Sequence, residues 1–132
     1  MTKYFISTTI LFLTLTVSFG QTQNDMNQNE YNFYKKAEKE INSVYQKILK
    51  EYSSDPEFIK NLKAAQRLWI QFRDADVKAK YPNKPQGYYG SVYPMCVSSY
   101  MTQLTNDRIK TLRVWLTGIE EGDVCSGSVK TQ

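Results

Sequence analysis

Apolar residues recur every three or four positions along residues 22–52. They are Met26, Phe33, Ala37, Ile41, Val44, Ile48 and Tyr52, and charged residues occupy the opposite face. This period predicts one long amphipathic helix over the segment. Thr22 and Asp25 have the spacing of a capping box, with Asp in place of the usual Glu, so we expect the helix to begin at Thr22.

Two further helices are predicted by the same pattern. Asp55 is suited to cap a helix and Pro56 to its first position, so the second helix is expected from Pro56 to about Lys80. The third is expected from about Met95 to Thr117, with Gly118 ending it. The residues expected on the inner stripe of the second helix are Phe58, Ile59, Leu62, Ala65, Trp69, Phe72 and Asp76.

Residues 81–94 separate these two helices and contain three of the four prolines, two glycines and four tyrosines. Such a density of Pro and Gly excludes a helix and predicts a loop. Tyr88, Tyr89 and Tyr93 have two interpretations that the sequence leaves open. They either form a recognition surface, for which Tyr is well suited, or cap the open end of the helices.

The three segments together predict an all-α fold, a three-helix antiparallel bundle with a Tyr/Pro/Gly-rich loop before the third helix. Residues 21–132 are the right size for one domain. Residues 119–132 form a short polar tail in which Glu120, Glu121 and Asp123 make a compact acidic cluster.

The first twenty residues have a different composition. Lys3 is followed by an apolar stretch and then by Ser18-Phe19-Gly20, which is typical of a signal peptide over residues 1–20. A retained membrane anchor is the alternative, but the stretch is shorter than the ~20 residues that a bilayer requires. A secreted or periplasmic location is therefore expected.

The chain has two cysteines, Cys96 and Cys125. In an oxidising compartment they predict a disulfide that tethers the tail and stabilises the domain by roughly 3 kcal/mol. Two free thiols are the alternative.

The composition excludes much catalytic chemistry. The chain has no histidine, which removes Ser-His and Cys-His catalysis, and it has no nucleotide-binding loop. No metal site or cofactor is predicted. A net charge of +4 is mild for a nucleic-acid-binding domain.

Paired carboxylates remain as candidates for a glycosidase. Asp74 and Asp76, however, lie two apart on a predicted helix and face different directions, and Glu120 and Glu121 are expected to be solvated. We therefore expect a protein that is not an enzyme. Arg108 falls within an apolar stripe, where a charge requires a partner, so an ion pair with Asp74 or Asp76 is expected.

The second and third helices carry a recognisable pattern. It consists of Gln66-Arg67-x-Trp69 followed by Arg73-Asp74, and then Cys96, Leu104-Thr105, Arg108 and Leu112. It resembles the LprI-like lysozyme-inhibitor family, and the resemblance extends over residues 22–116. Two cysteines common in that family are replaced here by Asn29 and Val77.

The resemblance implies an exported, helical, bacterial domain that inhibits lysozyme. Gln66, Trp69, Arg73, Asp74 and Arg108 are the residues of its structural motif. Because animal lysozymes are basic, an inhibitor needs a local acidic surface.

The acidic cluster is the candidate for that surface, with its carboxylates entering the lysozyme cleft while the Tyr-rich loop stacks on the rim. The hypothetical binding residues are thus Tyr88, Tyr89, Tyr93, Glu120, Glu121 and Asp123. The alternative function is an envelope module that binds a protein or peptide and has no effect on lysozyme.

Overall fold

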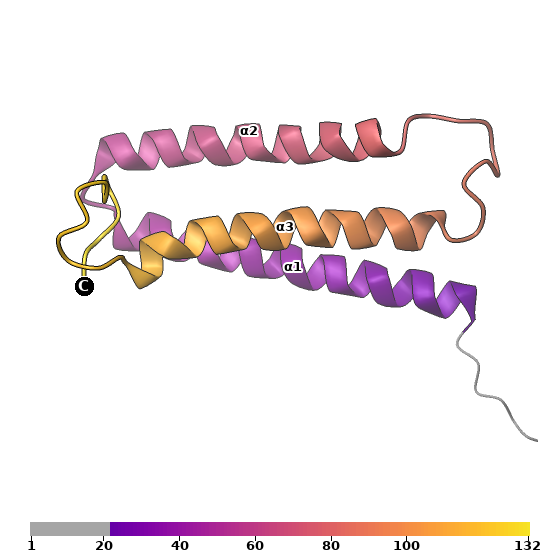
Figure 1. The fold of residues 1–132 in the computed structure, drawn as a ribbon, viewed down its shortest axis with the longest axis horizontal. Coiled ribbons are helices and arrows are strands. Elements are labelled where there is room, and N and C mark those ends of the chain that lie inside the picture. The colour runs from indigo at the N-terminus through magenta and orange to yellow at the C-terminus, as the bar shows by residue number, and fades with distance from the viewer. Residues whose placement is uncertain (1–21) are drawn as a thin grey trace, which may run out of the picture.

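A computed structural model describes residues 22–132 and confirms the predicted all-α architecture. The helices are α1 (Gln23–Glu51), α2 (Pro56–Lys80) and α3 (Tyr93–Thr117), and consecutive helices run antiparallel (Figure 1). The predicted signal peptide lies outside the described residues. None of the described helices is both long and apolar enough to cross a bilayer.

The helix boundaries follow from local capping. Thr22 Oγ1 accepts a hydrogen bond from Asp25 N and Asp25 Oδ2 accepts one from Thr22 N, both at 3.1 Å, which is the predicted capping box. Asp55 caps α2 through a 3.0 Å bond from Phe58 N. The third helix begins at Tyr93, two residues earlier than predicted, because Pro94 occupies its first turn, where a missing N–H costs nothing.

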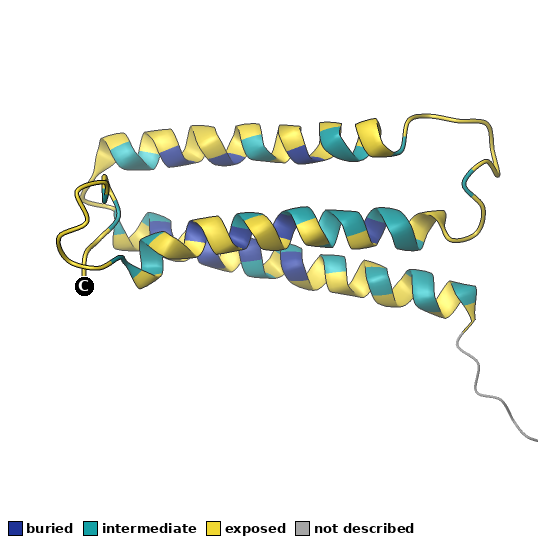
Figure 2. Cartoon of the chain, in the orientation of Figure 1, coloured by how far each residue is buried: buried dark blue, intermediate teal, exposed yellow. Residues whose placement is uncertain are grey.

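The hydrophobic core lies between α1 and α3. Its buried members are Ile41, Val44 and Ile48 from α1, Ile109 and Leu112 from α3, and only Leu62 from α2. Figure 2 shows the same imbalance, because most of α2 is exposed while α1 and α3 bury their facing sides. The second helix therefore contributes little to the core between α1 and α3.

The predicted inner stripe of α2 is partly wrong. Phe72 is 60% exposed and Ala65 is exposed, whereas Gln66 and Arg73 are buried. The helix carries apolar residues on two sides, and the side that faces the other helices follows Leu62, Gln66, Trp69 and Arg73. Hydrophobic periodicity alone could not select between the two sides.

The predicted disulfide is also wrong, because Cys96 and Cys125 are both free thiols. Cys96 lies in the first turn of α3, and Cys125 lies beyond the other end of that helix. A rise of about 1.5 Å per residue separates the two ends by roughly 30 Å, far more than the ~6 Å that a disulfide allows between Cα atoms.

The tail is held by hydrogen bonds instead. Ile119 N donates to Lys130 O at 3.0 Å, and Gln132 N donates to Ile119 O at 2.9 Å, so the segment closes on itself. The hydroxyl of Tyr52 donates to Trp115 O at 2.8 Å and accepts from Lys130 N at 3.1 Å. One side chain from α1 thus joins the end of α3 to the end of the chain.

Candidate functional site

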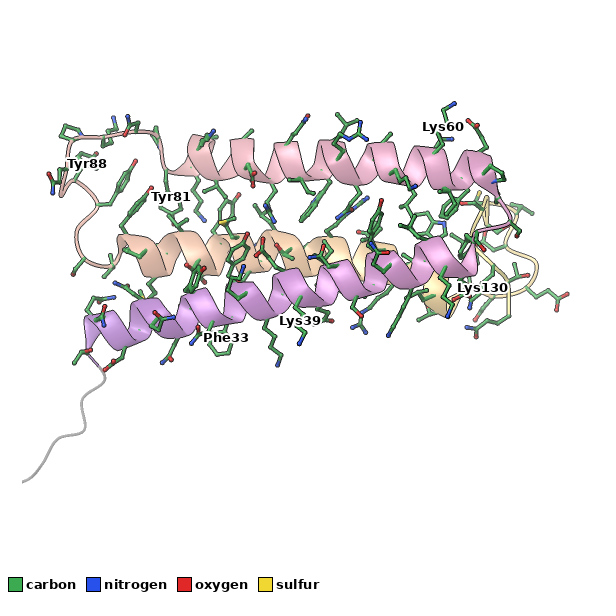
Figure 3. All side chains as sticks on the ribbon, turned by 180° about the vertical axis from the view of Figure 1, so that it is seen from behind. Phe33, Lys39, Lys60, Tyr81, Tyr88 and Lys130 are labelled. Atoms are coloured by element: carbon green, nitrogen blue, oxygen red, sulfur yellow. The ribbon has the colours of Figure 1, made fainter. Side chains whose placement is uncertain are left out.

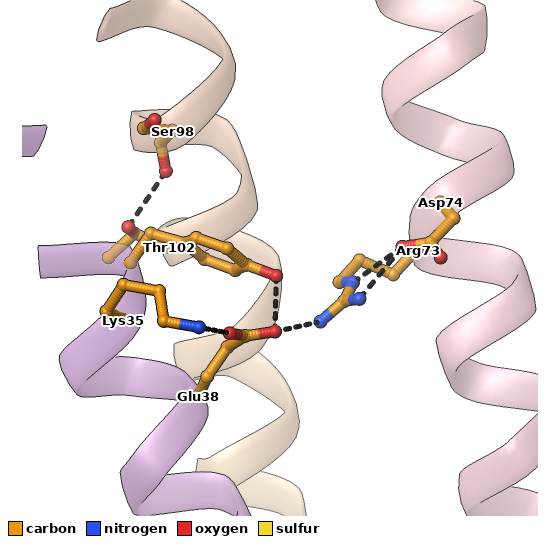
Figure 4. Close-up of polar contacts among 7 residues, drawn as sticks. Lys35, Glu38, Arg73, Asp74, Ser98 and Thr102 are labelled. Atoms are coloured by element: carbon orange, nitrogen blue, oxygen red, sulfur yellow. Dashed lines mark hydrogen bonds and ion pairs between the residues drawn. The ribbon is translucent and has the colours of Figure 1, made fainter. Parts of the chain in front are cut away.

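Arg73 is the central residue of a polar layer that attaches α2 to the other helices. Its guanidinium donates from Nε to Asp74 Oδ1 at 3.0 Å and approaches Glu38 Oε1 of α1 at 3.9 Å (Figure 4). It also lies 5.3 Å from the centre of the Trp69 ring, within the range of a cation–π contact. We call this layer, formed by Glu38, Gln66, Trp69, Arg73, Asp76, Tyr100 and Arg108, the polar seam.

Glu38 is held in the seam from three directions. It accepts hydrogen bonds from Tyr34 at 2.5 Å and Lys35 at 2.8 Å, in addition to its contact with Arg73. Burial alone would raise the pKa of Glu38, but the bonds from Lys35 and Tyr34 outweigh it, so the pKa is lowered. Burial, followed by the bond to Glu38, raises the pKa of the Tyr34 hydroxyl well above its usual range. The carboxylate is therefore ionised and the phenol neutral at physiological pH.

The expected ion pair of Arg108 with Asp74 or Asp76 is not formed. Arg108 Nε donates to Gln66 Oε1 at 3.1 Å, Asp74 is held by Arg73, and Asp76 accepts from the Tyr100 hydroxyl at 2.5 Å. Burial lowers the pKa of Arg108 from its ordinary value. Four of the five motif residues thus meet in the seam, and the fifth, Asp74, holds Arg73 from its rim.

The acidic cluster lies in a closed loop at one end of the bundle. Residues 119–131 leave α3 and return to it, and Glu120, Glu121 and Asp123 are all exposed. Val124, in the same segment, is 97% exposed. We call this segment the acidic loop. Gly118 lies directly before the acidic loop and has φ +79°. A Cβ at this position would lie 2.9 Å from Lys130 O, so the position requires glycine.

Two further carboxylates lie at the same end, and the sequence analysis did not include them among the site residues. Asp55, predicted only as a helix cap, and Glu57 line a cavity of about 470 Å³ together with Trp115 and Ser128. Trp115 Nε1 donates to Ser128 Oγ at 3.0 Å, which holds the loop against this cavity. More than sixty residues separate the two sets of carboxylates in the sequence, so only the fold reveals that they share one end.

The tyrosines lie at the opposite end of the molecule (Figure 3). The rings of Tyr89 and Tyr93 stack with centroids 4.9 Å apart, Tyr81 meets both edge-on, and the Tyr89 hydroxyl donates to Pro82 O at 2.6 Å. Tyr88 is 66% exposed and meets the Tyr89 ring edge-on, with centroids 5.0 Å apart, so all four rings form one cluster. Whether the tyrosines form a recognition surface or cap the helices stays a prediction.

The acidic loop and the tyrosines do not form one surface. They are separated by the length of α3, about 36 Å for its 25 residues. The sequence analysis expected a carboxylate inside the lysozyme cleft and a tyrosine on the rim of that cleft. The two groups lie too far apart to reach one small cleft together. Over the range 22–132, no group of three His, Cys, Asp or Glu residues is placed to hold a metal ion.

These features define an all-α scaffold with a polar seam between its helices and an exposed loop at either end. The family model described as "Lysozyme inhibitor LprI" matches residues 18–112, and the chain belongs to this family. Neither a curated protein nor a solved structure matches the chain significantly. The match contains the whole seam and ends before the acidic loop.

Proposed function

We propose that this protein is an exported, non-catalytic inhibitor that binds a lysozyme. Membership of the LprI family carries the proposal, because the matched residues contain nearly all of the three helices. A lysozyme that attacks the bacterial cell wall is met outside the cytoplasm, which agrees with the signal peptide expected over residues 1–20.

The acidic loop is the surface that we propose for contact. A basic enzyme is attracted to a local negative field, and such steering raises association rates by orders of magnitude at low salt. Glu120, Glu121 and Asp123 provide this field in a protein whose net charge is +4, and Asp55 and Glu57 extend it. The closed, projecting shape of the loop also suits a concave active-site cleft.

A second candidate function uses the other end of the molecule. Tyr88 is 66% exposed, and the ammonium group of Lys84 lies 5.6 Å from the centre of its ring. A large exposed aromatic ring beside a cation suits an envelope module that recognises a protein or peptide without affecting lysozyme. Tyr88→Ala would then abolish capture of that partner.

The test is the rate at which lysozyme lyses bacterial cell walls, titrated with the purified protein. Dose-dependent slowing that saturates near equimolar protein is expected. Glu120→Lys/Glu121→Lys is expected to weaken inhibition more than tenfold, and added salt should no longer weaken the inhibition that remains. The matched control is Glu30→Lys/Asp107→Lys, which changes the net charge equally but lies away from the loop.

Three outcomes would decide against parts of the proposal. No slowing at a large excess of folded protein would exclude inhibition and leave the envelope module. Full inhibition by the loop variant would exclude the acidic loop as the contact while retaining the family's activity. Equal weakening by the loop and control variants would attribute the effect to net charge.

A further inference from the structure

The side of α2 that faces away from the polar seam is unusually apolar for an exposed surface. Leu68 is 64% exposed and Phe72 is 60% exposed. At helical spacing around them lie three exposed alanines, Ala65, Ala75 and Ala79. These five residues form a continuous stripe, and together with the cations beside it we call this surface the outer face of α2.

A row of cations runs beside the apolar stripe. Lys60, Lys63 and Arg67 line a groove of about 690 Å³ between α1 and α2. Lys78 lies on the same side further along the helix, beyond Gln71 and Asp74, and the Asp74 carboxylate is paired with Arg73. The other residues that line the groove are Leu49, Ser53, Pro56, Ile59 and Ala64. None of them is acidic and all but Ser53 are apolar, so the lining of the groove combines apolar residues with three cations.

These cations have little internal compensation. Over residues 22–132, Lys63, Arg67 and Lys78 make no ion pair, and Lys60 approaches Glu57 only at 3.7 Å with both side chains more than 70% exposed. An ion pair of this exposure contributes almost nothing. The row is therefore available to an anionic partner.

The shape of this surface narrows the choice of partner. The second helix forms one long edge of the molecule (Figure 1), and Leu68 and Phe72 project from it into solvent. Exposed apolar side chains beside cations on one helix are the combination by which interfacial helices bind a membrane, with the apolar residues in the lipid and the cations at the headgroups. A second copy of the chain is disfavoured, because facing outer faces would place like charges together.

We propose that the outer face of α2 binds the surface of an anionic phospholipid membrane. Lys60, Lys63, Arg67 and Lys78 lie among the headgroup phosphates, while Leu68 and Phe72 enter the boundary between headgroups and acyl chains. This arrangement has the two ingredients of interfacial binding, apolar area and electrostatic attraction to anionic lipid. This proposal of membrane binding does not depend on the inhibition of lysozyme.

The experiment is co-sedimentation of the full chain with vesicles. Binding to vesicles that contain phosphatidylglycerol is expected, with little binding to pure phosphatidylcholine, and added salt should weaken it. Lys63→Gln/Arg67→Gln is expected to lower the partition coefficient about 30-fold, since each cation near an anionic surface contributes about 1 kcal/mol. Leu68→Ser/Phe72→Ser is expected to lower it by at least about tenfold without changing charge.

Matched controls lie on α1, whose exposed cations and apolar residues face elsewhere. Lys39→Gln/Lys47→Gln changes the net charge equally, and Phe33→Ser removes a ring that is 56% exposed. Both should leave binding within about twofold. Circular dichroism and thermal unfolding of every variant verify that the fold persists.

Several outcomes would overturn the proposal. The first is that the protein does not bind anionic vesicles, and the second is that the α1 control variants lose as much binding as the α2 variants. The third is full binding by Leu68→Ser/Phe72→Ser, because binding without the apolar residues would indicate a site for phosphate alone. Failure to bind vesicles combined with lost lysozyme inhibition in the α2 variants would identify the face as a protein-binding surface. Inhibition of lysozyme by a protein that does not bind vesicles would separate the two proposals.

Discussion

Replacing Arg73 with methionine tests whether the polar seam attaches α2 to the other helices. Methionine keeps most of the length of the side chain and removes only the guanidinium. Arg73 has 8% of its surface exposed, so nearly all of its contacts are with the protein. The variant should therefore lose the attachment without opening a large cavity.

The magnitude follows from the individual contacts. The ion pair with Asp74 contributes at most about 1 kcal/mol because the Asp74 side chain is 50% exposed, and the 3.9 Å contact with Glu38 contributes less. A partly desolvated cation–π contact with Trp69, at 5.3 Å, adds about 1 kcal/mol. Arg73→Met is therefore expected to lower the free energy of unfolding by about 2 kcal/mol.

Urea unfolding measures this loss, and hydrogen exchange shows where it occurs. Because α2 contributes only Leu62 to the buried core, its amides should lose protection well before those of α1 and α3. Lys63→Met, an exposed position on the same helix, is the control and should change stability by less than about 0.5 kcal/mol. A loss below about 0.5 kcal/mol for Arg73→Met, or uniform loss of protection in all three helices, would refute the role of the seam.

Four further predictions concern the core, the seam and the tail. Leu112→Ala should cost about 3–5 kcal/mol in urea unfolding, because the side chain has no exposed surface. The lowered pKa of Glu38 stabilises the fold above its ordinary value of 4.5, and this stability should be lost as pH falls through the lowered pKa. Glu38→Gln should flatten that part of the pH profile, and an unchanged profile would contradict the assignment. Gly118→Ala should accelerate proteolysis of the tail more than Gly122→Ala, since both have positive φ but only the former meets backbone at 2.9 Å. Tyr52→Phe should lower stability by about 1–2 kcal/mol in thermal unfolding, because it removes a hydroxyl that bonds at 2.8 Å and 3.1 Å.

The helix boundaries were predictable because their causes are local. The capping box at Thr22, the cap at Asp55 and the stop at Gly118 each act within a few residues of themselves. The sequence pattern predicts the start of α3 two residues late, because Pro94 follows a loop rich in proline. Proline is compatible with both a loop and a first helical turn, and only the neighbouring structure decides.

The rotation of α2 could not be predicted, because it depends on tertiary contacts. Phe72 is the more apolar residue, yet Arg73 is buried beside it. The cost of burying the Arg73 guanidinium is offset by Glu38, Asp74 and Trp69, which surround it. Of these three residues, Glu38 belongs to α1, so its position cannot be read from the sequence of α2. For the same reason the sequence indicated that Arg108 needs a partner but did not identify Gln66.

The error over the disulfide was avoidable from the sequence. The predicted third helix already placed Cys96 near its start and Cys125 eight residues beyond its end at Thr117. The helix separates them by about 30 Å, and eight residues reach that far back only when fully extended, at about 3.5 Å each. A tail with Gly118 and Gly122 in turns is shorter, so the length of the predicted helix disfavours the disulfide.

The candidate surfaces show why net charge is a poor guide to the partners of this chain. A value of +4 disfavours a basic enzyme as a ligand, yet the acidic loop concentrates negative charge at one end while most cations lie on helix sides. Charges within a Debye length, about 8 Å at physiological salt, dominate the electrostatic potential that acts on an approaching molecule. A lysozyme that approaches the loop and a membrane that approaches the outer face of α2 would therefore meet opposite fields on the same small protein. Because salt weakens both kinds of binding, salt dependence alone cannot separate them, and the uncharged substitutions at Leu68 and Phe72 can.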